Sequence, residues 1–349
     1  MTDSPAQIVL GLDTFGDMTT DLEGRPRHPA QVLRDVVEQA VLADRLGVDA
    51  ITLGEHHRED FAISSPEIVL GAIAGRTERI LLGTGVTVLS SDDPVRVYER
   101  FATLDGVSGG RAEVILGRGS FTESFPLFGY DLADYETLFA EKLDLFAKLR
   151  AEGPVTWSGR HRAPLVEQEV YPKTERPGGV RAWIGVGGSP HSVLRSVQSG
   201  IPMMLAIIGG EPRRFLPFAN LYRQSQEELG IAEPMPLGVH SPGHVAETDH
   251  EAREQLWEYF AAQRTRIGAE RGWPKATRFE FESEASEGAL FVGSPETVAQ
   301  KIARTVRTLG ADRFDLKYAN GAMPHEMLMS SIELYASEVV PRVRELLAG

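Results

Sequence analysis

AITLGEHHRED, residues 50–60, joins a short apolar run to a cluster of histidines, carboxylates and an arginine. A helical pattern with a proline near its start follows at residues 65–77, and a second apolar run occupies residues 79–89. Two continuous apolar runs connected by a helix are typical of parallel strands that are buried on both faces. The order strand, helix, strand therefore predicts an α/β fold in which the ionisable cluster follows the end of a strand.

The same alternation continues along the 349 residues of the chain. Eight such units in a chain of this length predict an α/β (β/α)8 TIM barrel with insertions, which residues 1–349 form as a single domain. A doubly wound open sheet is the alternative, but no linker separates two similar halves, which favours the barrel. The expected strands are residues 8–13, 49–54, 79–89, 112–117, 181–188, 202–208, 235–240 and 313–319.

Two connections are too long for simple loops of a compact domain. Residues 153–179 precede the fifth strand, so we expect this insertion at the N-terminal face of the barrel. Residues 241–293 lie between the seventh strand and its helix, at the C-terminal face where barrel active sites are built. This second excursion contains a helical pattern at residues 249–263. We expect it to act as a mobile lid, with a surface decoration as the alternative.

The composition excludes several classes of protein. Apolar residues make up 42% and charged residues 25%, as in ordinary globular proteins. The absence of cysteine excludes disulfides, thiolate metal sites and a cysteine nucleophile. A net charge of -14 disfavours binding to nucleic acid or to an anionic membrane. The chain shows no apolar run of about 18 residues and no secretory signal at its start, so we expect a cytoplasmic protein.

Three familiar motifs are approached but not matched. GVGGSP, residues 185–190, ends in Pro190 where the dinucleotide fingerprint GxGxxG requires glycine. GGSPH has His191 where the nucleophile elbow GxSxG requires glycine. HEMLM has Met329 where the zinc motif HExxH requires histidine. The sequence therefore supports neither a dinucleotide-binding fingerprint nor a serine nucleophile, and we expect no metal.

Side chains at the C-terminal ends of barrel strands point towards the active site. On an extended segment, Glu55 and His57 would face one way and His56 the other. A histidine here can be a satisfied structural residue, but two histidines with a carboxylate at this end of the barrel favour catalysis.

The fourth and fifth strand ends together predict a phosphate site. Gly187 and Gly188 let backbone N–H groups approach an anion at a helix N-terminus, where Ser189 and Ser192 add hydroxyl donors. Arg118 stands between glycines after the fourth strand, either as a phosphate clamp or in an ion pair with a neighbouring carboxylate. A tight structural turn is the alternative for the fifth strand end.

The third strand ends in GTGVTV, residues 83–88, whose small side chains would admit a flat ring or allow close packing inside the barrel. Four phenylalanines at expected loop positions hint at an apolar substrate, although aromatic residues are more often core. They are Phe15, Phe61, Phe121 and Phe125.

Three segments in this order resemble the bacterial luciferase-like family of flavin-dependent monooxygenases. They are GEHH at residues 54–57, the stretch from GTGVTV to ILGRG at residues 83–119, and SIELYASEVVPRVREL at residues 331–346. The spacing and strand order agree along nearly the whole chain. The resemblance implies a luciferase-like (β/α)8 barrel that binds FMN at its C-terminal face, usually in a homodimer.

The resemblance also implies roles for individual residues near the flavin ring. His56 matches the catalytic acid/base beside the reactive flavin carbon, and Glu55 matches a carboxylate close to the flavin. Thr84, Gly85 and Val86 match the backbone under the isoalloxazine, which in some members contains a non-proline cis peptide.

At the phosphate end, Arg118 matches the arginine that binds the FMN phosphate. Gly188 and Ser189 match the phosphate-binding turn, although the luciferases themselves have Glu-Ser there. That departure affects the expected ring contacts more than the phosphate contacts.

The implied activity is oxidation of a small, apolar organic substrate by reduced FMN and dioxygen through a flavin 4a-hydroperoxide, which requires a dry, closed site. A separate FMN reductase would supply FMNH2, so NAD(P)H would act indirectly. Two alternatives stay open at this point. One is a deazaflavin-dependent oxidoreductase that transfers hydride, and the other is a flavin-binding relative without catalytic activity.

Overall fold

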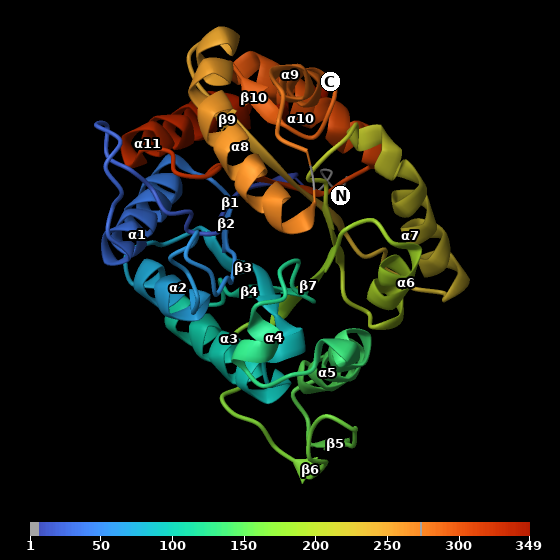
Figure 1. Cartoon of the computed structure of the whole chain (residues 1–349). Helices are drawn as coiled ribbons and strands as arrows, with labels where there is room; N and C mark the ends of the chain where they lie inside the picture. The colour runs from blue at the N-terminus through green and yellow to red at the C-terminus, as the bar shows by residue number, and fades with distance from the viewer. Residues whose placement is uncertain (1–6, 273) are drawn as a thin grey trace.

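The computed structural model describes residues 7–272 and 274–349, and eight parallel strands close into a barrel at its centre (Figure 1). β1 pairs with β2 and β11, and β9 pairs with β11 and β8, which completes the circle. The predicted barrel is therefore confirmed and the open sheet is excluded. The barrel strands are β1 Val9–Thr14, β2 Ala50–Leu53, β3 Leu81–Val88, β4 Glu113–Gly117, β7 Arg181–Val186, β8 Met203–Ala206, β9 Leu237–Val245 and β11 Arg313–Lys317.

Helices form a ring around the strands (Figure 1). Side chains cap several of them, as Asp93 does for α3 by accepting hydrogen bonds from the N–H groups of Val95 and Arg96. Such caps satisfy N–H groups that have no partner inside the helix. The ring consists of α1 Pro29–Leu46, α2 Pro66–Ala74, α3 Pro94–Ser108, α5 Tyr135–Leu149, α6 Pro190–Gln198, α7 Leu216–Glu228, α10 Pro295–Leu309, α11 His325–Leu334 and α12 Val340–Ala348. Shorter helical elements are Leu89–Ser91, α4 Ser124–Leu127, Leu132–Asp134, Pro212–Phe215 and the π-helical Tyr335–Val339.

The hydrophobic core lies between the strands and the helices. Residues such as Leu10 and Leu12 of β1 are fully buried there. Because successive residues of a strand point to opposite faces, the residues between them point into the barrel. Glycines make room on this inner face, and a Cβ added at Gly11 would collide with Asp315 of the neighbouring strand. Side chains therefore fill the lumen, as expected for a barrel of eight strands.

An ion-pair network fills the lumen near the N-terminal ends of the strands. Arg313 of β11 donates to Glu113 of β4 at 2.8 Å and to Asp315 at 2.9 Å. All three side chains are at most 2% exposed. One buried cation shared by two carboxylates is stable only as a complete set, because losing one member leaves an uncompensated charge in the interior.

The insertion at residues 153–179 contains an antiparallel hairpin of β5 Val155–Trp157 and β6 Leu165–Gln168 (Figure 1). It packs beside α5, where the indole N–H of Trp157 donates to Asp144 at 2.9 Å.

The second excursion is more ordered than the sequence pattern predicts. β9 continues to Val245, beyond the expected end of the seventh strand at residue 240. α8 Asp249–Arg271 outlasts the predicted helix by eight residues, and a further helix, α9 Arg278–Ser286, follows. The chain then returns through β10 Phe291–Gly293, which pairs with residues 243–245 of β9. In the described parts of the chain, no helix combines the length and apolar character needed to cross a membrane.

Candidate active site

Three phenylalanines surround His56 at the barrel mouth, by which we mean the C-terminal ends of the eight strands. The imidazole centroid lies 4.7 Å from the ring of Phe15, 4.4 Å from Phe61 and 5.3 Å from Phe121. The His56 side chain is only 11% exposed. The fourth candidate, Phe125, instead stacks on Tyr135 and is fully buried. His56 therefore lies in an apolar setting built by residues from three separate loops.

Glu123 is a carboxylate partner of His56 that the sequence did not reveal. Its Oε1 atom lies 3.9 Å from Nδ1 of His56 and accepts from the backbone N–H of His57 at 3.4 Å. Burial acts to raise the pKa of Glu123, but His56 and backbone donors outweigh it and hold the pKa below its ordinary value. An ionised carboxylate therefore lies beside the imidazole, on the side of Nδ1.

Glu55 and His57 face the same way, as the strand geometry predicts. Glu55 Oε1 lies 3.0 Å from His57 Nε2, and Glu55 Oε2 accepts from the backbone N–H of Val88 at 2.8 Å. The backbone N–H of Glu55 also donates to the carbonyl of Val86 at 3.2 Å. Glu55 thus ties the loop that carries His56 to the end of β3.

The end of β3 packs closely against the strands around it. The Gly85–Val86 peptide is cis, as it is in some members of the family that the sequence resembles. A Cβ at Gly85 would lie only 2.7 Å from Asp13 Oδ1, so glycine allows the backbone to approach the lumen there. The hydroxyls of Thr84 and Thr87, 2.9 Å apart, fix the strand from its buried side.

The predicted phosphate residues meet between β4, β7 and α6. Arg118 donates to the Ser192 hydroxyl at 3.3 Å, and the Ser189 hydroxyl donates to the same oxygen at 2.9 Å. Ser189 also caps α6 by accepting from the N–H of Ser192 at 3.2 Å. Gly188 has a φ of 96°, a left-handed conformation that glycine adopts without strain. Gly187 has open space where a Cβ would project.

Arg195 completes this arrangement, and the sequence analysis missed it. Its side chain is 11% exposed, and its Nη1 atom is buried without a hydrogen-bond partner among the described residues. Glu136 of α5 accepts from both Arg118 and Arg195, the latter at 3.0 Å. Burial opposes ionisation of Glu136, but the two guanidinium groups hold its pKa below the ordinary value. Arg118 and Arg195 therefore form an anion-binding site, which the half-exposed carboxylate of Glu136 occupies.

A second buried group that the sequence analysis missed lies under the mouth. Asp13 Oδ1 accepts from the Thr52 hydroxyl at 2.7 Å, and Asp13 Oδ2 lies 3.5 Å from Nδ1 of His240. Burial raises the pKa of Asp13 to about 8 and lowers the pKa of His240 to about 4. Lys317 lies beside them and donates to Asp17 at 3.1 Å. In the sequence, alternating charged residues along β11 place Lys317 on the inner face of the barrel, but they do not indicate Asp13 or His240 as its neighbours.

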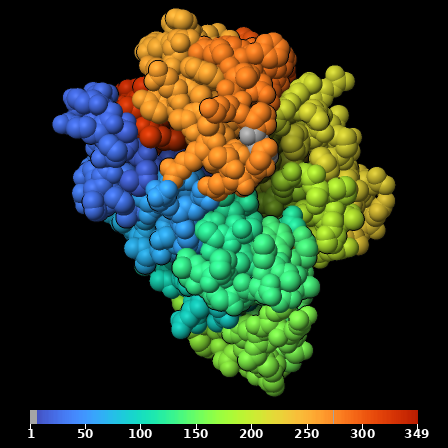
Figure 2. Space-filling view, viewed as in Figure 1, coloured from blue at the N-terminus to red at the C-terminus, as the bar shows by residue number. Residues whose placement is uncertain are grey.

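α8 reaches the loop that carries His56. Arg58 donates to Glu270 at 2.9 Å, and Arg271 donates to the carbonyl of Ser120 at 3.0 Å. Arg266 forms an ion pair with Asp60. In the space-filling view, the orange surface of the excursion adjoins the blue surface that follows β2 (Figure 2). Polar contacts therefore join the excursion to the rim of the barrel.

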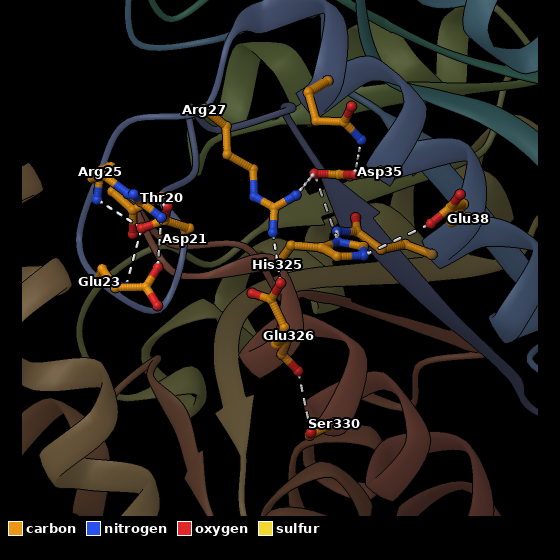
Figure 3. Close-up of polar contacts among 12 residues, drawn as sticks. Thr20, Asp21, Glu23, Arg25, Arg27, Asp35, Glu38, His325, Glu326 and Ser330 are labelled. Atoms are coloured by element: carbon orange, nitrogen blue, oxygen red, sulfur yellow. Dashed lines mark hydrogen bonds and ion pairs between the residues drawn. The ribbon is translucent and has the colours of Figure 1, made fainter.

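A group of possible metal ligands lies between α1 and α11 (Figure 3). One ligand atom each from Asp35, Glu38 and His325 lie within 4.8 Å of one another. Asp35 already accepts from Arg27 at 3.3 Å, and His325 Nδ1 is hydrogen-bonded to Gln39 at 3.0 Å. A guanidinium this close repels a cation, so we assign the group a role in joining the two helices.

The luciferase-like monooxygenase family model matches residues 14–313. A 4-hydroxyprotoasukamycin monooxygenase from Streptomyces nodosus subsp. asukaensis is 29% identical over 356 residues, which cover 96% of this chain and 94% of that protein. The crystal structure of monooxygenase RslO1 from Streptomyces bottropensis superposes with a TM-score of 0.82 at 25% identity, and covers 96% of this chain and 99% of that one. The chain therefore belongs to the luciferase-like monooxygenase family and is an oxidoreductase.

More distant structures share the fold and differ in cofactor. The oxygenating constituent of 3,6-diketocamphane monooxygenase from Pseudomonas putida, in complex with FMN, superposes with a TM-score of 0.75 at 19% identity over 97% of this chain and 99% of that one. An F420-dependent secondary alcohol dehydrogenase superposes with a TM-score of 0.72 at 18% identity over 97% of this chain and 99% of that one. Membership in a family of monooxygenases sets aside the non-catalytic alternative.

Proposed function

We propose that this monooxygenase binds FMN at the barrel mouth and uses the reduced form, FMNH2, with dioxygen to oxidise a small, apolar organic substrate. The observation that carries this proposal is the pairing of two features on one rim. His56, enclosed by phenylalanines, follows β2, and the anion site of Arg118 and Arg195 lies at β4 and α6. A cofactor with a flat ring at one end and a phosphate at the other could place its ring beside His56 and its phosphate at the anion site.

The residues fit the phosphate of FMN. Arg195 has a buried Nη1 atom without a partner in the described structure, and Glu136 shows that the two arginines accept a negative charge. Ser189, Ser192 and the N-terminus of α6 add further donors around the same point. In our proposal the phosphate takes over the donors that now contact Glu136.

The end of β3 fits a flat ring. Gly85 lacks a side chain, and a Cβ at Gly117 would lie 2.5 Å from a methyl carbon of Val86, so the backbone surface here is smooth and tightly packed. We assign Thr84, Gly85 and Val86 to ring contacts, and Glu55 to holding that strand end in place.

When bound, reduced flavin supplies the electrons that activate dioxygen. His56 would hold or accept the proton of the reaction, with the Glu123 carboxylate beside its ring. The three phenylalanines would exclude water from that proton and favour an apolar substrate. The excursion at residues 241–293 would act as a lid, whose closed position the ion pairs of Arg58 and Arg266 stabilise.

The remaining parts of the proposal concern the partners of the enzyme. No dinucleotide fingerprint is present in the sequence, so we propose that a separate reductase uses NAD(P)H and delivers FMNH2. We also propose a homodimer in the cytoplasm, as the family resemblance implies.

Flavin titration and oxygen consumption test the proposal together. The wild-type protein should quench FMN fluorescence on binding and consume oxygen when a reductase supplies FMNH2 and a suitable substrate is present. His56→Gln should bind FMN with an affinity within about twofold of wild type, because it keeps the size and polarity of the site, but should lose product formation by about 100-fold. His250→Gln, which changes an exposed histidine in the first turn of α8, is the matched control. Absence of FMN binding, or full product formation by His56→Gln, would contradict the proposal.

The deazaflavin alternative has support in the shared fold of the F420-dependent alcohol dehydrogenase. It predicts binding of F420 and hydride transfer without oxygen consumption. Parallel titrations with FMN and F420 separate the two, since binding of F420 without binding of FMN would replace our proposal.

A further inference from the structure

Asp13 and His240 form a polar pair inside the barrel that the proposed reaction does not yet use. Asp13, from β1, is fully buried, whereas the His240 side chain on β9 is 12% exposed. His240 is therefore the more accessible member of the pair. Its ring stacks parallel to Phe15 at a centroid distance of 6.3 Å, and Phe15 also contacts His56 at 4.7 Å. The pair thus belongs to the same neighbourhood as the proposed catalytic histidine.

The two carboxyl oxygens of Asp13 have different surroundings. Oδ1 accepts from Thr52, whereas Oδ2 is buried with no hydrogen-bond partner in the described structure. An ionised oxygen without a donor is costly to bury, so such an oxygen is stable when it carries a proton itself and donates to an acceptor. Nδ1 of His240, 3.5 Å away, is the acceptor in reach.

Burial favours this neutral form over an ion pair, because it penalises the charged state of both groups. Lys317 lies 4.6 Å above the ring of Phe15 and opposes a positive charge on His240. Asp315 and Asp17 oppose a negative charge on Asp13, although Thr52 and Lys317 act in the other direction. Burial adds to both effects, and it places the pKa of Asp13 near 8 and that of His240 near 4. Both groups are therefore neutral between those values.

We propose that Asp13 is a positioning residue that carries a proton in the folded enzyme and donates it in a hydrogen bond to Nδ1 of His240. His240 is thereby fixed as the tautomer with hydrogen on Nε2, and it presents this N–H to the barrel mouth beside Phe15. Among the described residues, no side chain hydrogen-bonds to Nε2 of His240, so this donor is available to a ligand. The inference rests on the proposed function in one respect, namely that the ligand at the mouth is the flavin ring or the substrate beside it.

Nitrogen NMR of protein labelled with ¹⁵N-histidine tests the tautomer without any cofactor. The chain has nine histidines, and His240→Gln identifies the signals of His240. The wild type should show His240 as the neutral Nε2–H tautomer from about pH 5 to about pH 7. Asp13→Asn should give the same result, because its amide N–H₂ donates to Nδ1 as a protonated carboxyl does. Asp13→Ala should lose this state, with mixed tautomers or a titration nearer the ordinary range.

An imidazolium or an Nδ1–H tautomer of His240 in the wild type would overturn the proposal, and this result needs no variant to fold. FMN titration provides the second readout. Asp13→Asn should bind FMN within about twofold of wild type, and Asp13→Ala about fivefold more weakly, as expected for one hydrogen bond of about 1 kcal/mol. Equal affinity in all three would overturn the positioning role. If none binds FMN while the NMR result holds, the proposed function fails and the state of the pair stands.

Discussion

Replacing Arg118 by methionine should weaken the binding of FMN and leave the binding of riboflavin almost unchanged. Riboflavin has the same ring as FMN but no phosphate, so the ratio of the two affinities isolates the phosphate contact. Methionine keeps the length of the side chain and removes the guanidinium that now contacts Ser192 and Glu136. The change therefore acts on charge and hydrogen bonding with little loss of packing.

The magnitude follows from an exchange of partners. A hydrogen bond to a charged group contributes about 1.5–3 kcal/mol. The phosphate must first displace Glu136, and an ion pair with an exposed partner contributes about 0.2–1 kcal/mol. The net loss in Arg118→Met is then about 1–2 kcal/mol, which corresponds to an FMN affinity about 5- to 30-fold weaker. By the same reasoning, Glu136→Gln should bind FMN up to about fivefold more tightly.

Fluorescence quenching with FMN and with riboflavin measures both affinities for each variant. Arg96→Met is the matched control, because Arg96 is an exposed arginine of α3 that forms an ion pair with Glu99 on the same helix. If Arg118→Met weakens riboflavin as much as FMN, the residue acts on the fold of the mouth and the reasoning is wrong. An unchanged FMN affinity would place the phosphate elsewhere.

Three further predictions concern the lid, the lumen and the pH dependence of stability. Glu270→Gln removes the carboxylate through which α8 pairs with Arg58, which keeps Asp60 as its other partner. Flavin should therefore dissociate faster in stopped-flow experiments than in Glu258→Gln, which alters an exposed position of the same helix. Equal rates would argue against a lid held by this pair. Arg313→Met leaves two buried carboxylates unpaired and should lower the free energy of unfolding by about 3–5 kcal/mol. With an unfolding entropy of roughly 2.1 cal/mol/K per residue, this loss lowers the Tm by about 4–7 °C. An unchanged calorimetric Tm would contradict the network. Folding raises the pKa of Asp13 from 3.8 to about 8, so its contribution to stability is greatest below the unfolded pKa and is lost as pH rises towards the folded pKa. The Tm of the wild type relative to that of Asp13→Asn should therefore fall between about pH 5 and about pH 8. A constant difference in Tm would show that Asp13 is ionised throughout this range.

Strand order and the location of the mouth could be predicted from the sequence because they depend on local patterns. Apolar runs separated by amphipathic helices identify a parallel barrel, and parallel strands bring their C-terminal ends to one rim. His56, Arg118 and Ser189 each follow such an end, so their common location required no knowledge of contacts. The glycines at residues 83 and 85 could be assigned to the end of the third strand in the same way, from their place in the apolar run.

Asp13, His240 and Arg195 could not be found in this way, since each gains its chemistry from a partner far along the chain. Asp13 and His240 are 227 positions apart and meet because β1 and β9 face the same lumen. Arg195 lies within α6, where an arginine usually faces solvent, and only the approach of α5 makes it a partner of Glu136. The length of α8 was also hidden, because only Ala252, Leu256 and Gly268 of the helix are buried, and so sparse an apolar set gives no clear period.

β10 gives the excursion a property that its length alone would not suggest. The chain leaves β9 at Val245 and returns along β10, whose last residue, Gly293, pairs with Val245. Neighbouring strands lie about 4.8 Å apart, so the two ends of the excursion are side by side. The two ends of this forty-five-residue segment are thereby joined to the barrel at one place, while the ion pairs of Arg58 and Arg266 join its middle to the rim. A segment whose two ends lie side by side can change in length without pulling the strands apart, so the cylinder itself sets little limit on how long this excursion is.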